Sequence, residues 1–222
     1  MKKLKQNIYF SIAIDGDSAS GKTTASKFIA KYFGLKLLTS GKLYRYLAYK
    51  IIKDKKKKLS KTYLKKITKN INFKNLQNNK MMYTDEVTSY ASSIAKIKFI
   101  RKLLNKFQKK FSKNKKFIIE GRDIGSKILP NADLKLFFRC SAEEKAKRRL
   151  KEYNKEKREI TLKEVKKSLK KRDYSDKNRK ESPLIFVKGA VLVDTTKLTI
   201  KQMEVKLKKV VQRAIKKKYG NL

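Results

Sequence analysis

The sequence predicts an α/β fold built on a parallel sheet, because short apolar runs alternate with amphipathic helical segments along the chain. The first apolar run, residues 8–14, leads directly into a glycine-rich segment. Apolar residues from Ala25 to Tyr32 then recur at the spacing of one helical face, and a second short apolar run covers residues 35–38. Strand, glycine-rich loop, helix and strand in this order begin a parallel α/β sheet.

The next part of the chain continues the helical pattern. Gly34 is placed to end the first helix, and Thr39 with Ser40 can cap the following one. Residues 51–83 are rich in lysine and asparagine and have weak periodicity, so we interpret them as part of an inserted lobe. Helical periodicity returns over residues 87–111.

Three more buried strands are predicted, over residues 117–119, 134–138 and 190–194. Capping boxes mark the starts of three helices, and they pair Ser141 with Glu144, Thr161 with Glu164, and Thr199 with Gln202. The strand over residues 117–119 delivers the segment from Glu120 to Asp123 at its carboxyl end. Ligands of open α/β sheets bind at that edge.

The glycine-rich segment fits the phosphate-binding loop pattern of glycine, four residues, glycine, lysine and then serine or threonine. It consists of Gly16, Asp17, Ser18, Ala19, Ser20, Gly21, Lys22 and Thr23, and Thr24 completes the predicted ATP-binding segment. The glycines allow a tight turn whose N–H groups point at polyphosphate, at the positive end of the next helix. Lys22 is predicted to bridge the outer phosphates, and the Thr23 hydroxyl to bind Mg²⁺ together with the ATP phosphates.

Composition limits the remaining possibilities. The chain has 222 residues, enough for one well-buried domain with an inserted subdomain. Its 62 Lys and Arg against 19 Asp and Glu give a formal net charge of +43, which favours polyanions in general. Because the lysines are spread along the chain and the aromatic residues fall at core spacing, we interpret them as solvated helix faces. We therefore expect non-specific polyanion binding at most, and no dedicated nucleic-acid partner.

The same composition bears on compartment and chemistry. A single cysteine, Cys140, rules out an internal disulfide and favours a reducing cytoplasm. The basic start, residues 1–5, resembles that of a signal peptide, but its apolar run meets Asp15 and Gly16 without a cleavage-type sequence. No apolar run is long enough to span a membrane. The absence of histidine excludes serine–histidine triads and histidine general bases. We expect a cytoplasmic monomer.

Arginines are informative in a chain that otherwise prefers lysine. A guanidinium group grips phosphate or a base edge at two points, which an ammonium group cannot do. Phosphoryl transfer between two nucleotides brings many negative charges together, so several arginines must converge on the site. The candidates are Arg45, Arg101, Arg122, Arg148, Arg149, Arg172 and Arg179.

Taken together, these motifs resemble those of the bacterial cytidylate kinases. The shared motifs occur in the family's order and run across nearly the whole chain; they are residues 12–16 with the loop, Ser-Gly-x-x-Tyr-Arg at 40–45, residues 91–95, Gly-Arg-Asp-Ile-Gly at 121–125, residues 171–173 and residues 176–179. The resemblance implies an enzyme of pyrimidine nucleotide metabolism that transfers the γ-phosphoryl group of ATP to CMP or dCMP with Mg²⁺. It also implies a P-loop three-layer fold with a five-stranded parallel sheet. Residues 1–222 would form one kinase domain, with 51–93 as a shortened inserted lobe that binds the nucleoside monophosphate and roughly 145–160 as a short lid.

The resemblance further assigns roles by motif position. It puts Ser40, Arg45, Ser92, Arg101, Arg122, Asp123, Arg172, Asp176 and Arg179 around CMP, and it makes Lys22, Arg148, Arg149 and Arg172 the catalytic set. Asp123 can accept a hydrogen bond from the amino group of cytosine while Arg101 donates to the ring nitrogen and carbonyl. Uracil reverses the pattern at the amino position, so this pair would set the choice of base.

Helix geometry adds a constraint on two of these residues. Ser92 and Arg101 are nine residues apart, which places them on opposite faces of an unbroken helix. Both can reach cytosine only if the helix breaks. We therefore predict a break between Ala95 and Phe99.

The sequence also departs from the family pattern. Asp17 stands where the family usually has proline, and Lys145 stands where its lid usually has arginine. Between Asn72 and Asp85 the chain is shorter than members with a full inserted β-lobe, and the usual Glu-Asp-Val-Ser segment is missing. Two alternatives stay open at this stage: a P-loop kinase for another nucleoside monophosphate, and a nucleic-acid-binding P-loop ATPase, which only the net charge favours.

Overall fold

The computed structural model describes residues 8–55, 59–76, 80–155 and 158–220. It contains two structural units: a sheet unit, Met1–Leu38 with Asn114–Leu222, and a helical unit, Thr39–Lys113. The predicted lobe, residues 51–93, falls within the helical unit. Residues 1–7, with the signal-like start, residues 56–58 and 77–79 of the predicted lobe, and residues 156–157 of the predicted lid lie outside the described residues.

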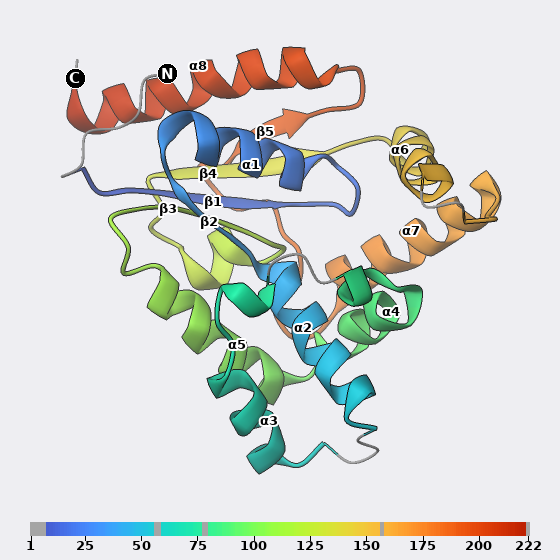
Figure 1. Ribbon diagram of the computed structural model, residues 1–222. Coiled ribbons are helices and arrows are strands. Elements are labelled where there is room, and N and C mark those ends of the chain that lie inside the picture. Colours follow the sequence, from blue (N-terminus) through green and yellow to red (C-terminus); the bar gives the residue numbers. More distant parts are fainter. Residues whose placement is uncertain (1–7, 56–58, 77–79, 156–157, 221–222) are drawn as a thin grey trace. The chain divides into compact units, whose positions relative to one another are not determined.

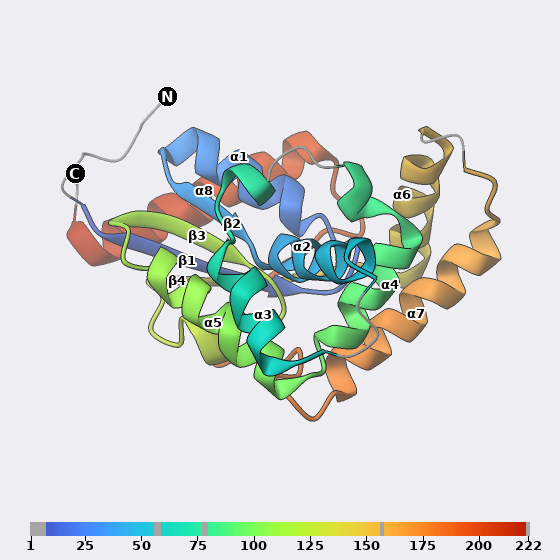
Figure 2. The ribbon, with the colours of Figure 1, turned by 60° about the horizontal axis from the view of Figure 1, so that its bottom comes forward.

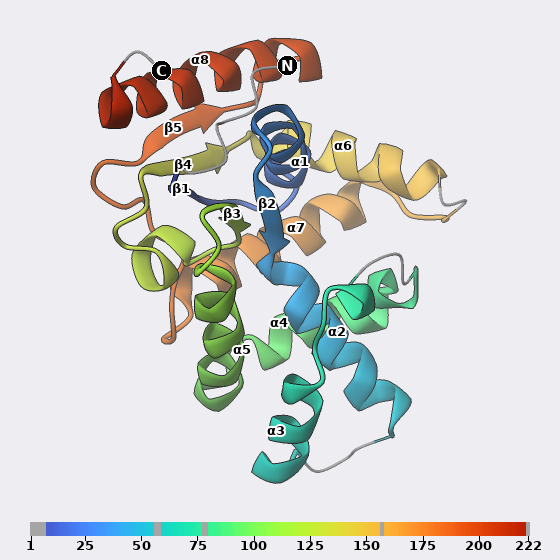
Figure 3. The same cartoon turned by 60° about the vertical axis from the view of Figure 1, so that its left-hand side comes forward.

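The described part of the sheet unit carries a five-stranded parallel sheet with the order β2-β3-β1-β4-β5 (Figure 3). The strands are β1 (Phe10–Gly16), β2 (Lys36–Thr39), β3 (Lys116–Glu120), β4 (Leu134–Arg139) and β5 (Val191–Asp194). β1 is buried along its whole length, as expected for the central strand of a sheet covered on both faces. In register, Ile14 pairs with Glu120, and Gly16 pairs with Phe138. The carboxyl ends of β1, β3 and β4 therefore meet at one edge.

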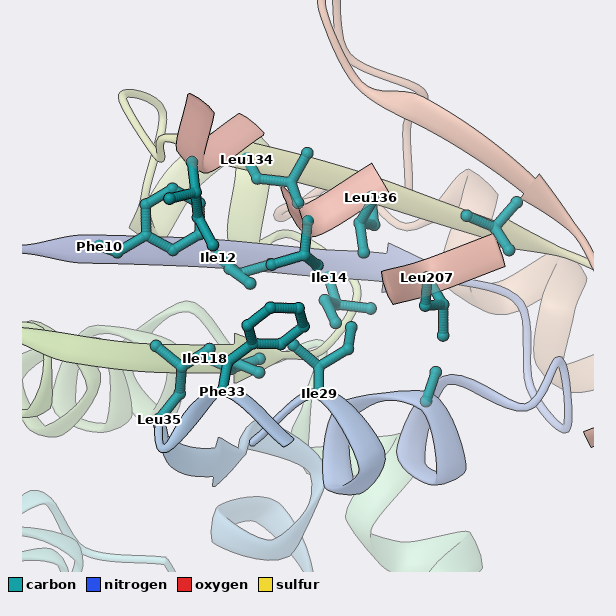
Figure 4. Close-up of a cluster of buried hydrophobic side chains, with 14 of the residues drawn as sticks. Phe10, Ile12, Ile14, Ile29, Phe33, Leu35, Ile118, Leu134, Leu136 and Leu207 are labelled. Carbon is teal, nitrogen blue, oxygen red and sulfur yellow. The ribbon is translucent and has the colours of Figure 1, made fainter. Parts of the chain in front are cut away.

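The main core lies between the sheet and two helices, α1 (Lys22–Phe33) and α8 (Ile200–Tyr219), which cover one of its faces (Figures 1 and 4). Phe10, Phe33 and Leu207 meet there, each almost completely buried. As predicted, α1 ends at Gly34, whose φ of 69° lies in the left-handed region. This packing fixes the start of α1, and with it the loop between β1 and α1.

A helical hairpin extends from the same unit. α6 (Ala142–Lys155) and α7 (Leu162–Asn178) pack on each other around Ala146, Val165 and Leu169 (Figure 1). The capping boxes predicted for α7 and α8 are both present, at Thr161 and Thr199, and Ser141 accepts the backbone N–H of Glu144 at 3.2 Å. A π-helical turn, η3 (Ile124–Ile128), follows β3.

The helical unit contains α2 (Ser40–Lys53), α3 (Lys61–Lys69), η1 (Lys74–Leu76), η2 (Lys80–Tyr83), α4 (Asp85–Ile94) and α5 (Lys98–Phe111). Within it, α2 packs against α4, and α3 packs against α5 (Figure 2). α2 begins at Ser40 with Thr39 as its N-cap, but the Thr39 side chain makes no capping hydrogen bond there. Over the described ranges of the chain, no helix combines the length and apolar character that a membrane span requires.

The predicted helix break is confirmed. α4 ends at Ile94 and α5 begins at Lys98, so the interruption falls at residues 95–97. The buried guanidinium group of Arg101 donates to the carbonyl of Ala95 at 2.9 Å. Arg101 thus satisfies a backbone acceptor that the end of α4 leaves without a helical partner.

Candidate functional site

The phosphate loop connects β1 to α1 and is shaped by close backbone contact. Gly16 has a φ of 144°, and a β-carbon at this position would lie 2.1 Å from the carbonyl oxygen of Phe138 on β4. The N–H of Asp17 donates to the same oxygen at 3.2 Å. Gly21, with a φ of 83°, is the N-cap of α1. Only glycine allows the chain to leave the sheet this close to β4.

Lys22 lies in the first turn of α1 and is buried. Its Nζ donates to the carbonyl oxygen of Asp17 at 2.6 Å, so the side chain folds over the loop. Burial, followed by the positive charges of Arg122 and Arg172, lowers the pKa of Lys22 to about 7, although Glu120 opposes the shift. An anionic ligand beside Lys22 would raise this pKa again and stabilise the ammonium form, so the site favours anions.

Thr23 and Ser26 connect α1 to the end of β3. Thr23 Oγ1 donates to Glu120 Oε1 at 2.9 Å, and Ser26 Oγ donates to Glu120 Oε2 at 3.2 Å. Glu120 is buried. Glu120 is not among the predicted site residues, although its position at the carboxyl end of a buried strand is a signal for one. It now stands beside the hydroxyl predicted to bind Mg²⁺.

Asp15, the penultimate residue of β1, holds the segment that follows β3. Its two carboxylate oxygens accept the N–H groups of Ile124 at 2.9 Å and Gly125 at 2.7 Å. Burial raises the pKa of Asp15 to about 6 against the opposing effect of these hydrogen bonds. The contact holds the buried Asp123, the N-cap of η3, close to the phosphate loop.

Three predicted arginines act on one carboxylate of α7. Arg122 Nε donates to Asp176 Oδ2 at 2.7 Å, and Arg122 Nη2 donates to Ser18 Oγ in the phosphate loop at 2.9 Å. Arg179 donates to the second oxygen of Asp176 at 3.2 Å. Burial favours a higher pKa for Asp176, but the charges of Arg122, Arg172 and Arg179 outweigh it and hold the pKa below its usual value. The cluster therefore keeps three guanidinium groups and one carboxylate charged beside the loop.

The two arginines of α6 differ in their surroundings. Arg148 donates to the hydroxyl of Thr195 at 3.1 Å and to its carbonyl at 2.7 Å. The Thr195 hydroxyl in turn donates to the carbonyl of Ser20 at 3.0 Å, so Arg148 is tied to the phosphate loop through Thr195. No motif in the sequence indicated that Thr195 belongs to the site. Arg149 instead pairs with Glu152 on its own helix at 2.8 Å and lies over the ring of Tyr153.

The helical unit holds the other four predicted residues. Arg45 lies over the ring of Tyr83, with 5.0 Å to its centroid, and Arg101 lies over the ring of Tyr44 at 5.6 Å. Ser40 is buried at the start of α2, and Ser92 Oγ donates to the carbonyl of Thr88 within α4 at 3.3 Å. The break at residues 95–97 places Ser92 and Arg101 on separate helices.

The fold and the site together define a kinase of the P-loop class. The central strand leads into a phosphate-binding loop, a buried lysine covers it, Arg122 contacts it directly, and Arg148 is linked to it through Thr195. Two solved structures share the fold: an uncharacterised protein from Eubacterium ventriosum (TM-score 0.53, 14% identity, 92% of this chain and 98% of that one) and a gluconokinase from Sinorhizobium meliloti (TM-score 0.51, 14% identity, 95% of each).

Sequence comparison identifies the particular family. The family model described as cytidylate kinase matches residues 12–214. The cytidylate kinase of Fusobacterium nucleatum is 40% identical over 202 residues, which cover 86% of this chain and 92% of the relative. That of Thermosipho melanesiensis is 38% identical over 213 residues, which cover 92% and 98%. The chain belongs to the cytidylate kinase family, and it is a nucleoside monophosphate kinase that phosphorylates CMP or dCMP.

Proposed function

We propose that the chain transfers the γ-phosphoryl group of ATP to CMP or dCMP by in-line displacement, with the phosphate loop of the sheet unit as the donor site. The observation that carries this proposal is the convergence of Lys22, Arg122 and Arg148 on one loop whose backbone geometry suits polyphosphate. Phosphoryl transfer depends mainly on positioning and on neutralising charge, and these groups can supply both.

On the donor side, the loop of residues 16–24 holds the ATP phosphates through its N–H groups other than those of Asp17 and Ser18, which donate to Phe138 and Asp173. The ammonium group of Lys22 leaves the Asp17 carbonyl to bridge the outer phosphates, because an anion is a stronger partner than a neutral carbonyl. Arg148, Arg149 and Arg172 complete the catalytic set by stabilising the transferring group. Groups that cover the site also exclude water, which would otherwise hydrolyse ATP.

A magnesium ion fits the residues at the start of α1. The Thr23 hydroxyl and the Glu120 carboxylate, 2.9 Å apart, are hard oxygen donors of the kind that Mg²⁺ prefers. The part of the chain that the structure describes has no group of three or more acidic or cysteine side chains placed to hold a metal, so phosphate oxygens and water would supply the other ligands. We propose that Thr23 binds the ion and that Glu120 orients Thr23. When bound, Mg²⁺ neutralises charge on the phosphates.

For the acceptor, we propose that Asp123 and Arg101 read cytosine through the hydrogen bonds described above. In the sheet unit, Arg122, Arg172, Asp176 and Arg179 are the proposed contacts of CMP. In the helical unit, the proposed contacts are Ser40, Arg45, Ser92 and Arg101. An uncompensated carboxylate facing the uracil carbonyl is unfavourable, which gives the selectivity a physical basis.

The test is a comparison of Asp123→Asn with the parent enzyme. The asparagine side chain can present either an acceptor or a donor to the base, so we expect the preference for CMP over UMP to fall by at least roughly tenfold in kcat/KM. The exposed carboxylate of Asp54 gives the control variant, Asp54→Asn, which should retain the preference. An unchanged preference in Asp123→Asn would remove Asp123 from base recognition. Comparable turnover of UMP or AMP by the parent would favour a kinase for another monophosphate.

A further inference from the structure

Asp17 is an unusual residue for a loop that binds polyphosphate, because it adds a negative charge beside a polyanion. Its side chain is only 6% exposed. The carboxylate is directed towards the α6–α7 hairpin: Oδ2 lies 3.6 Å from Nζ of Lys145 on α6, and Oδ1 lies 3.3 Å from Nζ of Lys177 on α7. The loop carboxylate is therefore compensated by two cations from neighbouring helices.

Lys145 is held by two carboxylates at once. Its Nζ also donates to Asp173 on α7, and its side chain is 8% exposed. Asp173 in turn accepts the backbone N–H of Ser18 at 3.0 Å, so this buried network returns to the phosphate loop. Lys177 differs because half of its side chain, 52%, is exposed to solvent, which weakens its pairing. Lys145 is accordingly the main counter-charge of Asp17.

An apolar contact joins the same elements. Ala19, which has a φ of 53°, packs against the cluster that Ala146 forms with Val165 and Leu169 between α6 and α7. Asp17 and Ala19 thus both anchor the loop to the hairpin, one by charge and one by packing. The ionic part is balanced, with Asp17 and Asp173 facing Lys145 and Lys177.

We propose that Lys145 is a positioning residue, whose ammonium group neutralises Asp17 within the phosphate loop and does not itself contact the nucleotide. Asp17 and Lys145, two of the positions where the chain departs from its family's pattern, are then a single compensated change. This inference rests on the proposed binding of ATP at the loop. It assigns the nucleotide contacts of α6 to Arg148 and Arg149 alone.

The test is a double-mutant cycle on ATP binding with Asp17→Asn, Lys145→Met and the double variant. Lys145→Met leaves one uncompensated negative charge in the phosphate loop, and at an effective dielectric constant of about 20 its repulsion of the phosphates should weaken ATP binding by at least roughly tenfold. Asp17→Asn should bind ATP at least as tightly as the parent. The double variant should match the parent to within about twofold, because it loses one charge of each sign and the cluster stays balanced. In Lys145→Met, the KM for ATP should rise while kcat stays within about twofold.

Direct contact between Lys145 and a phosphate predicts a different result. The double variant would then bind ATP at least roughly tenfold more weakly than the parent, because Asp17→Asn cannot replace a lost phosphate contact, and that outcome overturns the inference. Lys147→Met is the matched control, since the Lys147 side chain on the same helix is 61% exposed and should be dispensable. If Lys145→Met alone does not fold, the comparison of the parent with the double variant still decides, because a tenfold loss there contradicts the proposal. A parent enzyme that binds no ATP would instead overturn the proposed function as well.

Discussion

The lowered pKa of Lys22 predicts that ATP binding takes up a proton near neutral pH. In the free protein this pKa is about 7, mainly because the ammonium group is buried and faces Arg122 and Arg172. Phosphate oxygens in contact with Nζ favour the charged form and raise the pKa again. Well below pH 7 the lysine is charged with or without ligand, and binding takes up almost no proton. Above pH 7 the free lysine is neutral and must be protonated, so affinity falls as the pH rises.

The size of the effect follows from the same value. With a pKa of about 7, about one tenth of the free sites are neutral at pH 6 and about nine tenths at pH 8. The dissociation constant for ATP should therefore be about tenfold higher at pH 8 than at pH 6, which corresponds to about 1.4 kcal/mol. The ionisation of ATP itself acts in the opposite direction, because its more charged form binds a cationic site better.

Isothermal titration calorimetry can measure this proton directly. A non-hydrolysable ATP analogue is titrated in two buffers that differ in ionisation enthalpy, and the difference in heat gives the protons taken up. We expect the uptake due to Lys22 to be about 0.9 proton per site at pH 8 and about 0.1 at pH 6. Lys22→Met is the control that reports the ionisation of the ligand alone. The reasoning is refuted if parent and Lys22→Met show the same uptake at pH 8.

Two further predictions concern the loop and its metal. Gly16→Ala should destabilise the protein by at least about 4 kcal/mol in thermal or denaturant unfolding, because the added carbon would meet the Phe138 carbonyl at 2.1 Å. Glu120→Gln should raise the Mg²⁺ concentration needed for half-maximal turnover by roughly tenfold, because the residue that orients the Thr23 hydroxyl loses its charge. Unchanged stability in the first variant, or an unchanged Mg²⁺ requirement in the second, contradicts the role assigned here.

Each of these variants has a matched control. Gly41→Ala also adds one carbon, but there the nearest atom would be the flexible guanidinium end of Arg45 at 3.8 Å, so stability should be preserved. Glu159→Gln removes the charge of an exposed carboxylate and should leave the Mg²⁺ requirement unchanged.

The fold was predictable where the signal is local. The Gly34 terminus of α1 and the capping boxes at Thr161 and Thr199 depend on residues within one turn of each other, and all three are present. The break after α4 was predictable for a different reason, since the family resemblance assigns both Ser92 and Arg101 to CMP and they could not share a face of one unbroken helix. These features follow from short-range geometry and from a count of residues per turn.

The site was predictable only in part. The phosphate-loop residues are recognisable from a short sequence pattern, but the residues that contact the loop come from distant segments of the chain. Glu120 reaches Thr23 across 97 positions, and Asp173 reaches Ser18 across 155. Which strand ends meet depends on the strand order of the sheet, which no local pattern encodes. For the same reason the sequence left Asp17 unexplained until the packing of α6 and α7 placed Lys145 beside it.

The choice of acceptor is the central claim, and steady-state kinetics test it most directly. ADP formation from ATP is followed in a coupled assay with CMP, dCMP, UMP and AMP in turn. We expect kcat/KM for CMP or dCMP to exceed the values for UMP and AMP by at least roughly a hundredfold, as buried hydrogen-bonding groups provide. Equal or faster turnover of UMP or AMP, or ATP hydrolysis that depends on a nucleic acid and on no monophosphate, would contradict the account.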